Sequence, residues 1–206
     1  ESYRQMKSIL DSKEIGETLM VHNRHRNPTV PDFYSCDFFF NDTAINEIYT
    51  MRWLLGEEIV SVRVDKPKKT THRFEHLQDP LVLIMYTESG VWIDDEIFVN
   101  NQHSYDIQCE AVAELGTVRP SDQHRIERTG TIGRSNALTM DHNQRFWGAF
   151  VTEVQEWVSA VARGEHTGST SWDGYAAACV CDAGVAALES DGLVPVTMID
   201  KPEFYA

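Results

Sequence analysis

The chain of 206 residues has no run of 18 apolar residues, so its sequence predicts no membrane-spanning helix. It also lacks the phosphate-binding patterns G-x-G-x-x-G and G-x-x-x-x-G-K-[ST] and the G-x-S-x-G pattern. The nearest glycine-rich stretch, GTIG at 130–133, has the wrong spacing and precedes no predicted helix. We therefore predict that this chain by itself binds no dinucleotide.

Basic residues are scarce relative to acidic ones. The chain has 18 Lys and Arg against 32 Asp and Glu, which gives a formal net charge of −14. A surface this acidic repels phosphate backbones and anionic lipids, so neither nucleic acid nor a membrane is an expected partner. The sequence begins at Glu1 with no signal peptide, which indicates a piece of a longer protein.

Cysteines are few and scattered, at positions 36, 109, 179 and 181. Their spacing fits neither a zinc site nor a disulfide framework, which favours a reduced, cytoplasmic setting. His72 and His76 are four residues apart, as metal ligands on a helix would be, but they lie in KKTTHRFEHLQDP. That stretch has little apolar periodicity and is predicted to be a loop, so no metal site is expected.

Alternating and helical patterns predict a single α+β domain over residues 1–206, with a large, open, mostly antiparallel sheet and helices packed on one face. A long uninterrupted run of strands, joined mainly by short turns, carries this prediction. The predicted helices are 2–16, 42–55, 142–163 and 171–190. The predicted strands are 17–27, 58–66, 80–89, 90–100, 105–115, 117–120 and 123–129.

Two late helices carry apolar side chains at helical spacing. In the helix 142–163 this face consists of Phe146, Phe150, Val154, Trp157 and Val161. In the helix 171–190 the predicted buried side consists of Trp172, Tyr175, Ala176, Cys179 and Ala183. Small residues on that second helix predict a close approach to a neighbouring backbone.

The strand 90–100 predicts which sheet face is open. If its aliphatic residues face the helices, Trp92 and Phe98 point outward with Asp94 and Glu96. Outward aromatic residues on an open sheet indicate a contact between subunits, and hence a homo-oligomer. The alternative is two scattered surface aromatics without such a role.

The predicted helix NDTAINEIYTMRW, which begins with Asn41 as its N-cap, carries a polar stripe beside its buried face. Asp42, Asn46, Tyr49 and Trp53 follow one another at i, i+4, i+7 and i+11, so they share one side of the helix. This stripe is a candidate binding surface. The alternative is an N-cap followed by an ordinary solvated face.

Two further clusters are candidates for ligand contacts. In HNRHRNP, His22 and His25 lie on opposite strand faces, and His25, nearer the loop, is the one expected in a cleft, unless it is a surface or N-cap histidine. In NNQHSYDIQCE, we predict that Asn101, His103 and Tyr105 share one side of a strand. Amides and phenols both donate and accept hydrogen bonds, which suits a polyhydroxyl ligand, although a hairpin rim has the same composition.

Several strings resemble one known family when they are taken together and in order. They are HRNP after a strand, DTAINEIYTMRWLL as a helix, YDIQCE in a late strand, WDGYAA opening the last helix, and the KPEFY tail. The set resembles the inositol 2-dehydrogenases of the glucose-fructose oxidoreductase/inositol dehydrogenase/rhizopine-catabolism family, and it extends from the first helix to the last residues. The resemblance covers only the family's C-terminal domain.

The resemblance implies an N-terminal Rossmann domain that binds NAD or NADP and carries a catalytic lysine, and that domain is absent from this chain. It also implies a polyol or sugar substrate, an oligomer and no metal. The family's helix reads D-x-x-x-H-E-I-D, in which the His accepts the proton of the oxidised hydroxyl. Asp42 matches the first Asp, whereas Asn46 replaces the His and Tyr49 replaces the last Asp.

These replacements leave two functional hypotheses. Because an amide is not basic at neutral pH, Asn46 can bind a hydroxyl but cannot accept its proton. His25 and Tyr49 are the candidate substitutes; His25 and Tyr105 match family residues near the substrate, and His103 stands where relatives often have Tyr. The chain is expected to be either part of an inositol-type dehydrogenase, inactive alone, or a polyol-binding or oligomerisation module without catalysis.

Overall fold

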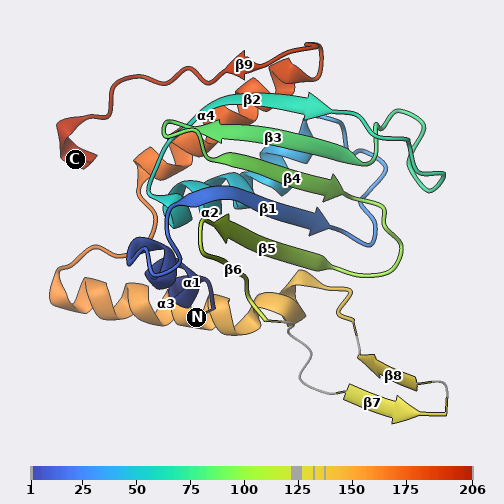
Figure 1. The fold of residues 1–206 in the computed structure, drawn as a ribbon, viewed down its shortest axis with the longest axis horizontal. Helices are drawn as coiled ribbons and strands as arrows, with labels where there is room; N and C mark the ends of the chain where they lie inside the picture. Colours follow the sequence, from blue (N-terminus) through green and yellow to red (C-terminus); the bar gives the residue numbers. More distant parts are fainter. Residues whose placement is uncertain (1, 122–126, 132, 137, 206) are drawn as a thin grey trace.

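A large sheet dominates the structure, a computed structural model that describes residues 2–121, 127–131, 133–136 and 138–205 (Figure 1). Its seven strands follow the order β6-β5-β1-β4-β3-β2-β9, and a separate hairpin pairs β7 with β8. The strands of the large sheet are β1 (Thr18–Arg26), β2 (Ile59–Asp65), β3 (Leu81–Thr87), β4 (Trp92–Phe98), β5 (Asp106–Ala113), β6 (Gly116–Val118) and β9 (Val194–Pro195). The helical elements are α1 (Ser2–Asp11), a π-helix η1 (Phe39–Ala44), α2 (Ile45–Leu55), α3 (His142–Arg163), α4 (Ser171–Ala187) and a 3-10 helix η2 (Glu203–Tyr205).

Strand β1 lies inside the sheet between β5 and β4. It pairs parallel with β4 and antiparallel with β5. The other ladders of the sheet are antiparallel. Helices α2 and α4 cover one face of this sheet (Figure 1). The predicted α+β class is therefore confirmed.

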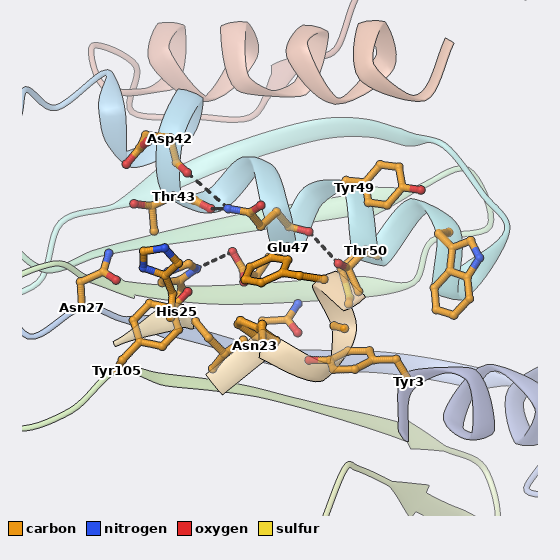
Figure 2. Close-up of a pocket in the computed structure, with 18 of the residues that line it drawn as sticks. Tyr3, Asn23, His25, Asn27, Asp42, Thr43, Glu47, Tyr49, Thr50 and Tyr105 are labelled. Carbon is orange, nitrogen blue, oxygen red and sulfur yellow. Dashed lines mark hydrogen bonds and ion pairs between the residues drawn. The ribbon is translucent and has the colours of Figure 1, made fainter. Parts of the chain in front are cut away.

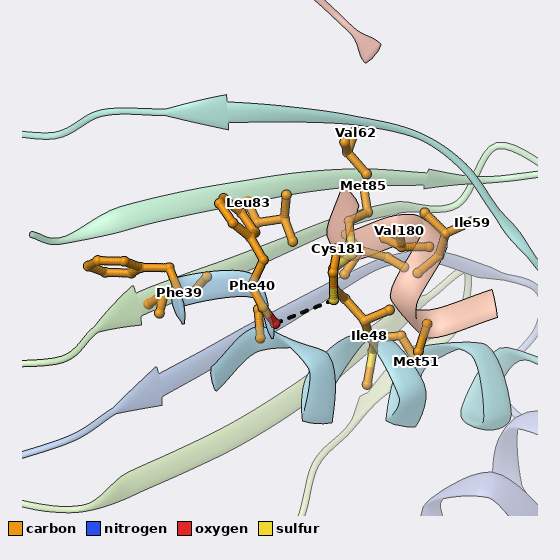
Figure 3. Packing of buried hydrophobic residues seen from close by; sticks show 14 of the residues in the cluster. Phe39, Phe40, Ile48, Met51, Ile59, Val62, Leu83, Met85, Val180 and Cys181 are labelled. Carbon is orange, nitrogen blue, oxygen red and sulfur yellow. Dashed lines mark hydrogen bonds between the residues drawn. The ribbon is translucent and has the colours of Figure 1, made fainter. Parts of the chain in front are cut away.

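The predicted N-cap at Asn41 is wrong, because the chain is already helical two residues earlier, in η1. The reason is the apolar pair Phe39 and Phe40, whose side chains are completely buried and draw this turn onto the core (Figure 3). Helix α2 continues directly from η1, so no side-chain cap is needed. It ends as predicted at Gly56, whose positive φ of 69° suits glycine.

Helix α4 packs closely on η1, as its small residues predict. The Sγ of Cys181 donates a hydrogen bond to the carbonyl of Phe40 at 3.4 Å (Figure 3). Burial raises the pKa of this thiol to about 12, so it remains a donor. The predicted buried side is only partly right: Tyr175 is exposed and Cys179 is half-buried, whereas Cys181 is buried. The buried face of α4 therefore includes Cys181, which contacts η1, and not Cys179 as predicted.

Helix α3 lies beyond the β6 edge, beside α1, instead of on the sheet (Figure 1). The two guanidinium nitrogens of Arg4 on α1 reach the carboxylate of Glu156 on α3 at 2.7 and 2.6 Å. Much of the predicted apolar face is exposed: Val154, Trp157 and Val161 keep 57–59% of their surface accessible. Periodicity thus identified an amphipathic helix without saying whether the chain covers it.

The hairpin β7 (Glu127–Gly130) and β8 (Gly133–Asn136) stands apart from the large sheet (Figure 1). It contains the end of the predicted strand 123–129; residues 122–126 lie outside the described residues. Gly130 and Gly133 of the GTIG stretch therefore pair at the end of the hairpin, and strand β8, not a helix, begins at Gly133. In the part of the chain that the structure describes, no helix is long and apolar enough to cross a membrane.

Strand β4 alternates as its sequence predicts. Ile93 and Ile97 are completely buried under the helices, whereas Trp92 and Phe98 are partly exposed on the opposite face. The open face of the sheet therefore carries two aromatic side chains, together with the carboxylates of Asp94 and Glu96.

Candidate functional site

A cavity of about 690 Å³ lies between α2 and α3, over the ends of β1 and β5 (Figure 2). This volume is within the range of ordinary small-molecule sites. Helix α1 contributes Tyr3 to its wall, β1 contributes His25, and α3 contributes His142 and Phe146. Together with α2, these elements line one cavity that carries both polar and apolar side chains.

The predicted polar stripe faces this cavity. Asp42, Asn46, Tyr49 and Trp53 all line it, although Asp42 belongs to η1 and the rest to α2. The stripe therefore lines the cavity, although Asp42, Asn46 and Trp53 are also exposed to solvent.

Two members of the stripe are held in place by hydrogen bonds. The amide nitrogen of Asn46 donates to the carbonyls of Asp42 and Thr43, at 3.3 and 3.1 Å. The Tyr49 hydroxyl accepts a hydrogen bond from Ser169 Oγ at 2.7 Å. The donors of Asn46 are thus directed at its own helix, and its amide oxygen is the atom left for a ligand.

A buried histidine–carboxylate contact joins the sheet to α2 in the cavity wall. His25 Nδ1 lies 2.9 Å from Glu47 Oε2 (Figure 2), and the two side chains retain only 6% and 8% of their accessible surface. The prediction that His25 points into a cleft, and His22 away from it, is confirmed.

Glu47 was missed by the sequence reading, although it lines the cavity. One signal was available: Thr43, Glu47 and Met51 follow one another at four-residue intervals and are all buried. A carboxylate on that buried side of the helix needs a partner, and the partner is His25, 22 residues earlier in the sequence.

Tyr105 lies next to His25, immediately before β5. Its ring stands edge-on to the His25 ring, with 5.7 Å between centroids, and 6.2 Å from the rings of His142 and Phe146. Burial, reinforced by the charge of Glu47, raises the pKa of Tyr105 to about 12. At neutral pH its phenol is therefore a hydrogen-bond donor and not a base.

His103 does not line the cavity. The residues from Asn100 to Ser104 form a turn instead of the predicted strand, so the predicted shared side of Asn101, His103 and Tyr105 is wrong. The Nδ2 of Asn101 donates hydrogen bonds to the carbonyls of Asn27 and Ser104, at 2.8 and 2.7 Å, and these bonds stabilise the turn. His103 is exposed, with Nδ1 2.8 Å from the Asn101 carbonyl.

Beneath the cavity lies a completely buried carboxylate, Asp95 of β4, which is in register with Asn23 of β1. Neither Asp95 oxygen has a hydrogen-bond partner in the structure, and neither does the Nδ2 of Asn23, which lines the cavity. Burial raises the pKa of Asp95 well above its usual value, and the charge of Glu47 raises it further. Both effects favour the protonated, neutral form of Asp95.

This arrangement suits a small polyol. The carboxylate of Asp42 and the amide oxygen of Asn46 accept hydrogen bonds from hydroxyls, while Tyr105 donates. The described residues contain no group of three His, Cys, Asp or Glu side chains placed to hold a metal ion. They also offer no glycine-rich cradle for a dinucleotide, since the GTIG turn belongs to the isolated hairpin.

A family model and individual relatives both match this chain. The model of the GFO/IDH/MocA C-terminal domain matches residues 3–119, more than half of the chain. Inositol 2-dehydrogenase 3 from Saccharopolyspora erythraea is 50% identical over 203 residues, which are 98% of this chain and 60% of that protein. Inositol 2-dehydrogenase from Pseudomonas fluorescens is 42% identical over 205 residues, the whole of this chain and 61% of that protein.

A solved structure shows the same fold. Myo-inositol dehydrogenase from Lactobacillus casei, crystallised in complex with NAD(H) and myo-inositol, is 32% identical and superposes with a TM-score of 0.94 over 100% of this chain and 62% of that one. The chain therefore spans about three fifths of the length of these relatives. By the extent of the domain match, the chain belongs to the GFO/IDH/MocA C-terminal domain family.

Proposed function

We propose that this chain is the substrate-binding domain of an NAD(P)-dependent dehydrogenase that oxidises a CH–OH group of an inositol or a related sugar. The observation that carries the proposal is the single cavity in which the α2 stripe meets His25, Glu47 and Tyr105. The inositol 2-dehydrogenases that match nearly the whole chain support the substrate class.

In this proposal Asp42, Asn46 and Tyr105 bind the substrate's hydroxyls. Asp42 and Tyr105 stand on different elements, so a ring-shaped polyol would bridge them and be fixed in one orientation. His142 and Phe146 of α3 line the same cavity and would shield the ligand from water. Orientation of this kind is a large part of what an enzyme contributes to a two-substrate reaction.

The cofactor would be held mainly by a part of the protein outside this chain. The described residues provide no dinucleotide cradle, and the relatives are longer by a segment of suitable size for another domain. NAD or NADP, when bound, supplies the acceptor for the hydride. The NAD(H) in the Lactobacillus casei structure supports this assignment. The 206 residues alone are then expected to be inactive.

A second function, polyol binding or assembly without catalysis, is favoured by Asn46. Its amide cannot accept a proton, and its nitrogen is already hydrogen-bonded to backbone carbonyls. Under this alternative the cavity would retain a polyol without turning it over.

The full-length parent protein distinguishes the two functions. Steady-state NAD reduction with myo-inositol is measured for the parent and for an Asn46→His variant, with scyllo-inositol and glucose as comparison substrates. Turnover by the parent that Asn46→His does not increase supports the dehydrogenase. An inert parent that gains at least about tenfold on Asn46→His supports the binding function. Failure of both proteins to reduce NAD or to bind any of these polyols by calorimetry would contradict both.

We also propose a cytoplasmic location. All four cysteines are free, although Cys36 and Cys179 are partly exposed. Free thiols at accessible positions agree with a reducing compartment. A thiol titration of freshly purified protein under denaturing conditions, performed without added reductant, is expected to count four thiols per chain.

A further inference from the structure

Oxidation of an alcohol by hydride transfer requires a proton acceptor. The C–H electron pair leaves as hydride to the nicotinamide, the O–H bond breaks, and a carbonyl forms. The released proton must pass to a group that lies in the cavity and is basic near neutral pH. This inference rests on the proposed dehydrogenase function.

The cavity offers few bases. Asn46 is an amide, and Tyr105 holds its proton because burial raises its pKa to about 12. The hydroxyl of Tyr49 accepts the hydrogen bond of Ser169, and a phenol at neutral pH is a donor. Asp42, Glu47 and Glu153 are carboxylates, and a carboxylate is a weaker base than an imidazole.

Two imidazoles remain, and they differ in their surroundings. The side chain of His142 is 61% exposed at the start of α3, and its nearest carboxylate, that of Asp141, is 3.6 Å away. His25 is buried, and its Nδ1 is 2.9 Å from Glu47. Only His25 is thus both enclosed and oriented by a carboxylate.

The contact with Glu47 also fixes the proton on the ring. A carboxylate accepts, so Nδ1 of a neutral His25 carries the hydrogen and Nε2 keeps its lone pair. Nε2 makes no hydrogen bond to another described residue, and His25 lines the cavity. The same Glu47 charge stabilises the imidazolium that forms when Nε2 takes up a proton, as in a carboxylate–histidine pair of hydrolases.

We propose that His25 is the general base of the reaction, accepting the substrate's hydroxyl proton at Nε2, and that Glu47 is its positioning residue. The pair spans β1 and α2, so the proton acceptor comes from the sheet instead of from position 46 of the helix. Deprotonation at His25 and polyol binding by the α2 stripe would then occur in the same cavity.

The structure supplies a matched control for this pair. His22, three residues earlier on β1, also places its Nδ1 against a carboxylate, 2.5 Å from Asp94, but on the opposite, open face of the sheet. A His22→Gln variant removes the same kind of imidazole–carboxylate contact without touching the cavity. Any general effect of losing such a pair would show in both variants.

The experiment is steady-state kinetics of the full-length protein with myo-inositol and NAD. His25→Gln is expected to lower kcat by about 10²- to 10⁴-fold with KM changed only a few-fold. Glu47→Gln should lower kcat at least about tenfold, again with a smaller change in KM, since a loosened binding wall alone would raise KM instead. His22→Gln should retain kcat within about twofold.

A rescue variant guards against misfolding. Asn46→His in the His25→Gln background places an imidazole elsewhere on the same cavity wall, and it should recover at least about tenfold of the lost kcat. An active parent whose His25→Gln variant keeps its kcat would overturn the base assignment and leave the proposed function standing. A parent without turnover on any polyol would overturn the dehydrogenase function, and the base assignment with it.

Discussion

Gly184 of α4 lies against the ring of Phe40, so close that a Cβ built on the glycine would stand 2.6 Å from the ring's Cδ1. The ring is completely buried and cannot move aside without disturbing the core. Phe40 belongs to the turn η1, which carries Asp42 and Thr43 into the cavity wall. The absence of a side chain at position 184 therefore sets where one wall of the candidate site stands.

Gly184→Ala is expected to lower the free energy of unfolding by about 1–3 kcal/mol, because the added methyl group overpacks the interface of α4 with η1. Chemical denaturation of the chain measures the change. Gly174→Ala, in the first turn of the same helix, is the control: a Cβ added there would meet no atom within 4 Å, and alanine should stabilise by about 0.5–1 kcal/mol. Equal effects at the two positions would contradict the close-packing argument.

Trp92 stands on the open sheet face, and we propose that this face joins subunits. Replacement by a charged residue, Trp92→Glu, should weaken self-association, because the carboxylate would lose its water in the interface. Light scattering over a dilution series of the parent protein measures the dissociation. Trp157→Glu tests another exposed apolar surface, on α3, where Trp157 is 59% exposed. Dissociation by Trp157→Glu but not by Trp92→Glu would place the interface on α3 instead.

Alternation and helical spacing in the sequence predicted most of the sheet and the stripe on α2, because both patterns depend only on residues a few positions apart. Glu47 was missed because its burial depends on His25, which reaches it only through the fold. The apolar face of α3 was recognised, but periodicity does not say whether another part of the chain covers it. His103 was placed on a strand because the polar run gave no sign of the turn closed by Asn101.

The buried carboxyl group of Asp95, beneath the cavity, should make the stability of the chain depend on pH. It is completely buried and its oxygens have no hydrogen-bond partner. Burial and the charge of Glu47 raise its pKa well above the usual aspartate value in the folded chain. The unfolded chain releases this proton near pH 4, so folding above that pH requires the uptake of a proton. The contribution of Asp95 to stability therefore falls as pH rises, by up to about 1.4 kcal/mol per pH unit until the folded pKa is reached.

Asp95→Asn removes this dependence, because an amide resembles the protonated acid in shape and stays neutral at every pH. We expect the variant to gain stability relative to the native chain by at least about 1 kcal/mol between pH 5 and pH 8. Urea denaturation at several pH values measures the difference in the free energy of unfolding between the variant and the native chain. The contributions of the other titrating groups cancel in this difference. Any offset caused by the amide itself is constant with pH and is read at about pH 3, below the unfolded pKa, where Asp95 is largely protonated in both states. A difference that does not change with pH would show that Asp95 is ionised in the folded chain, and Glu47 would then share its surroundings with a second negative charge.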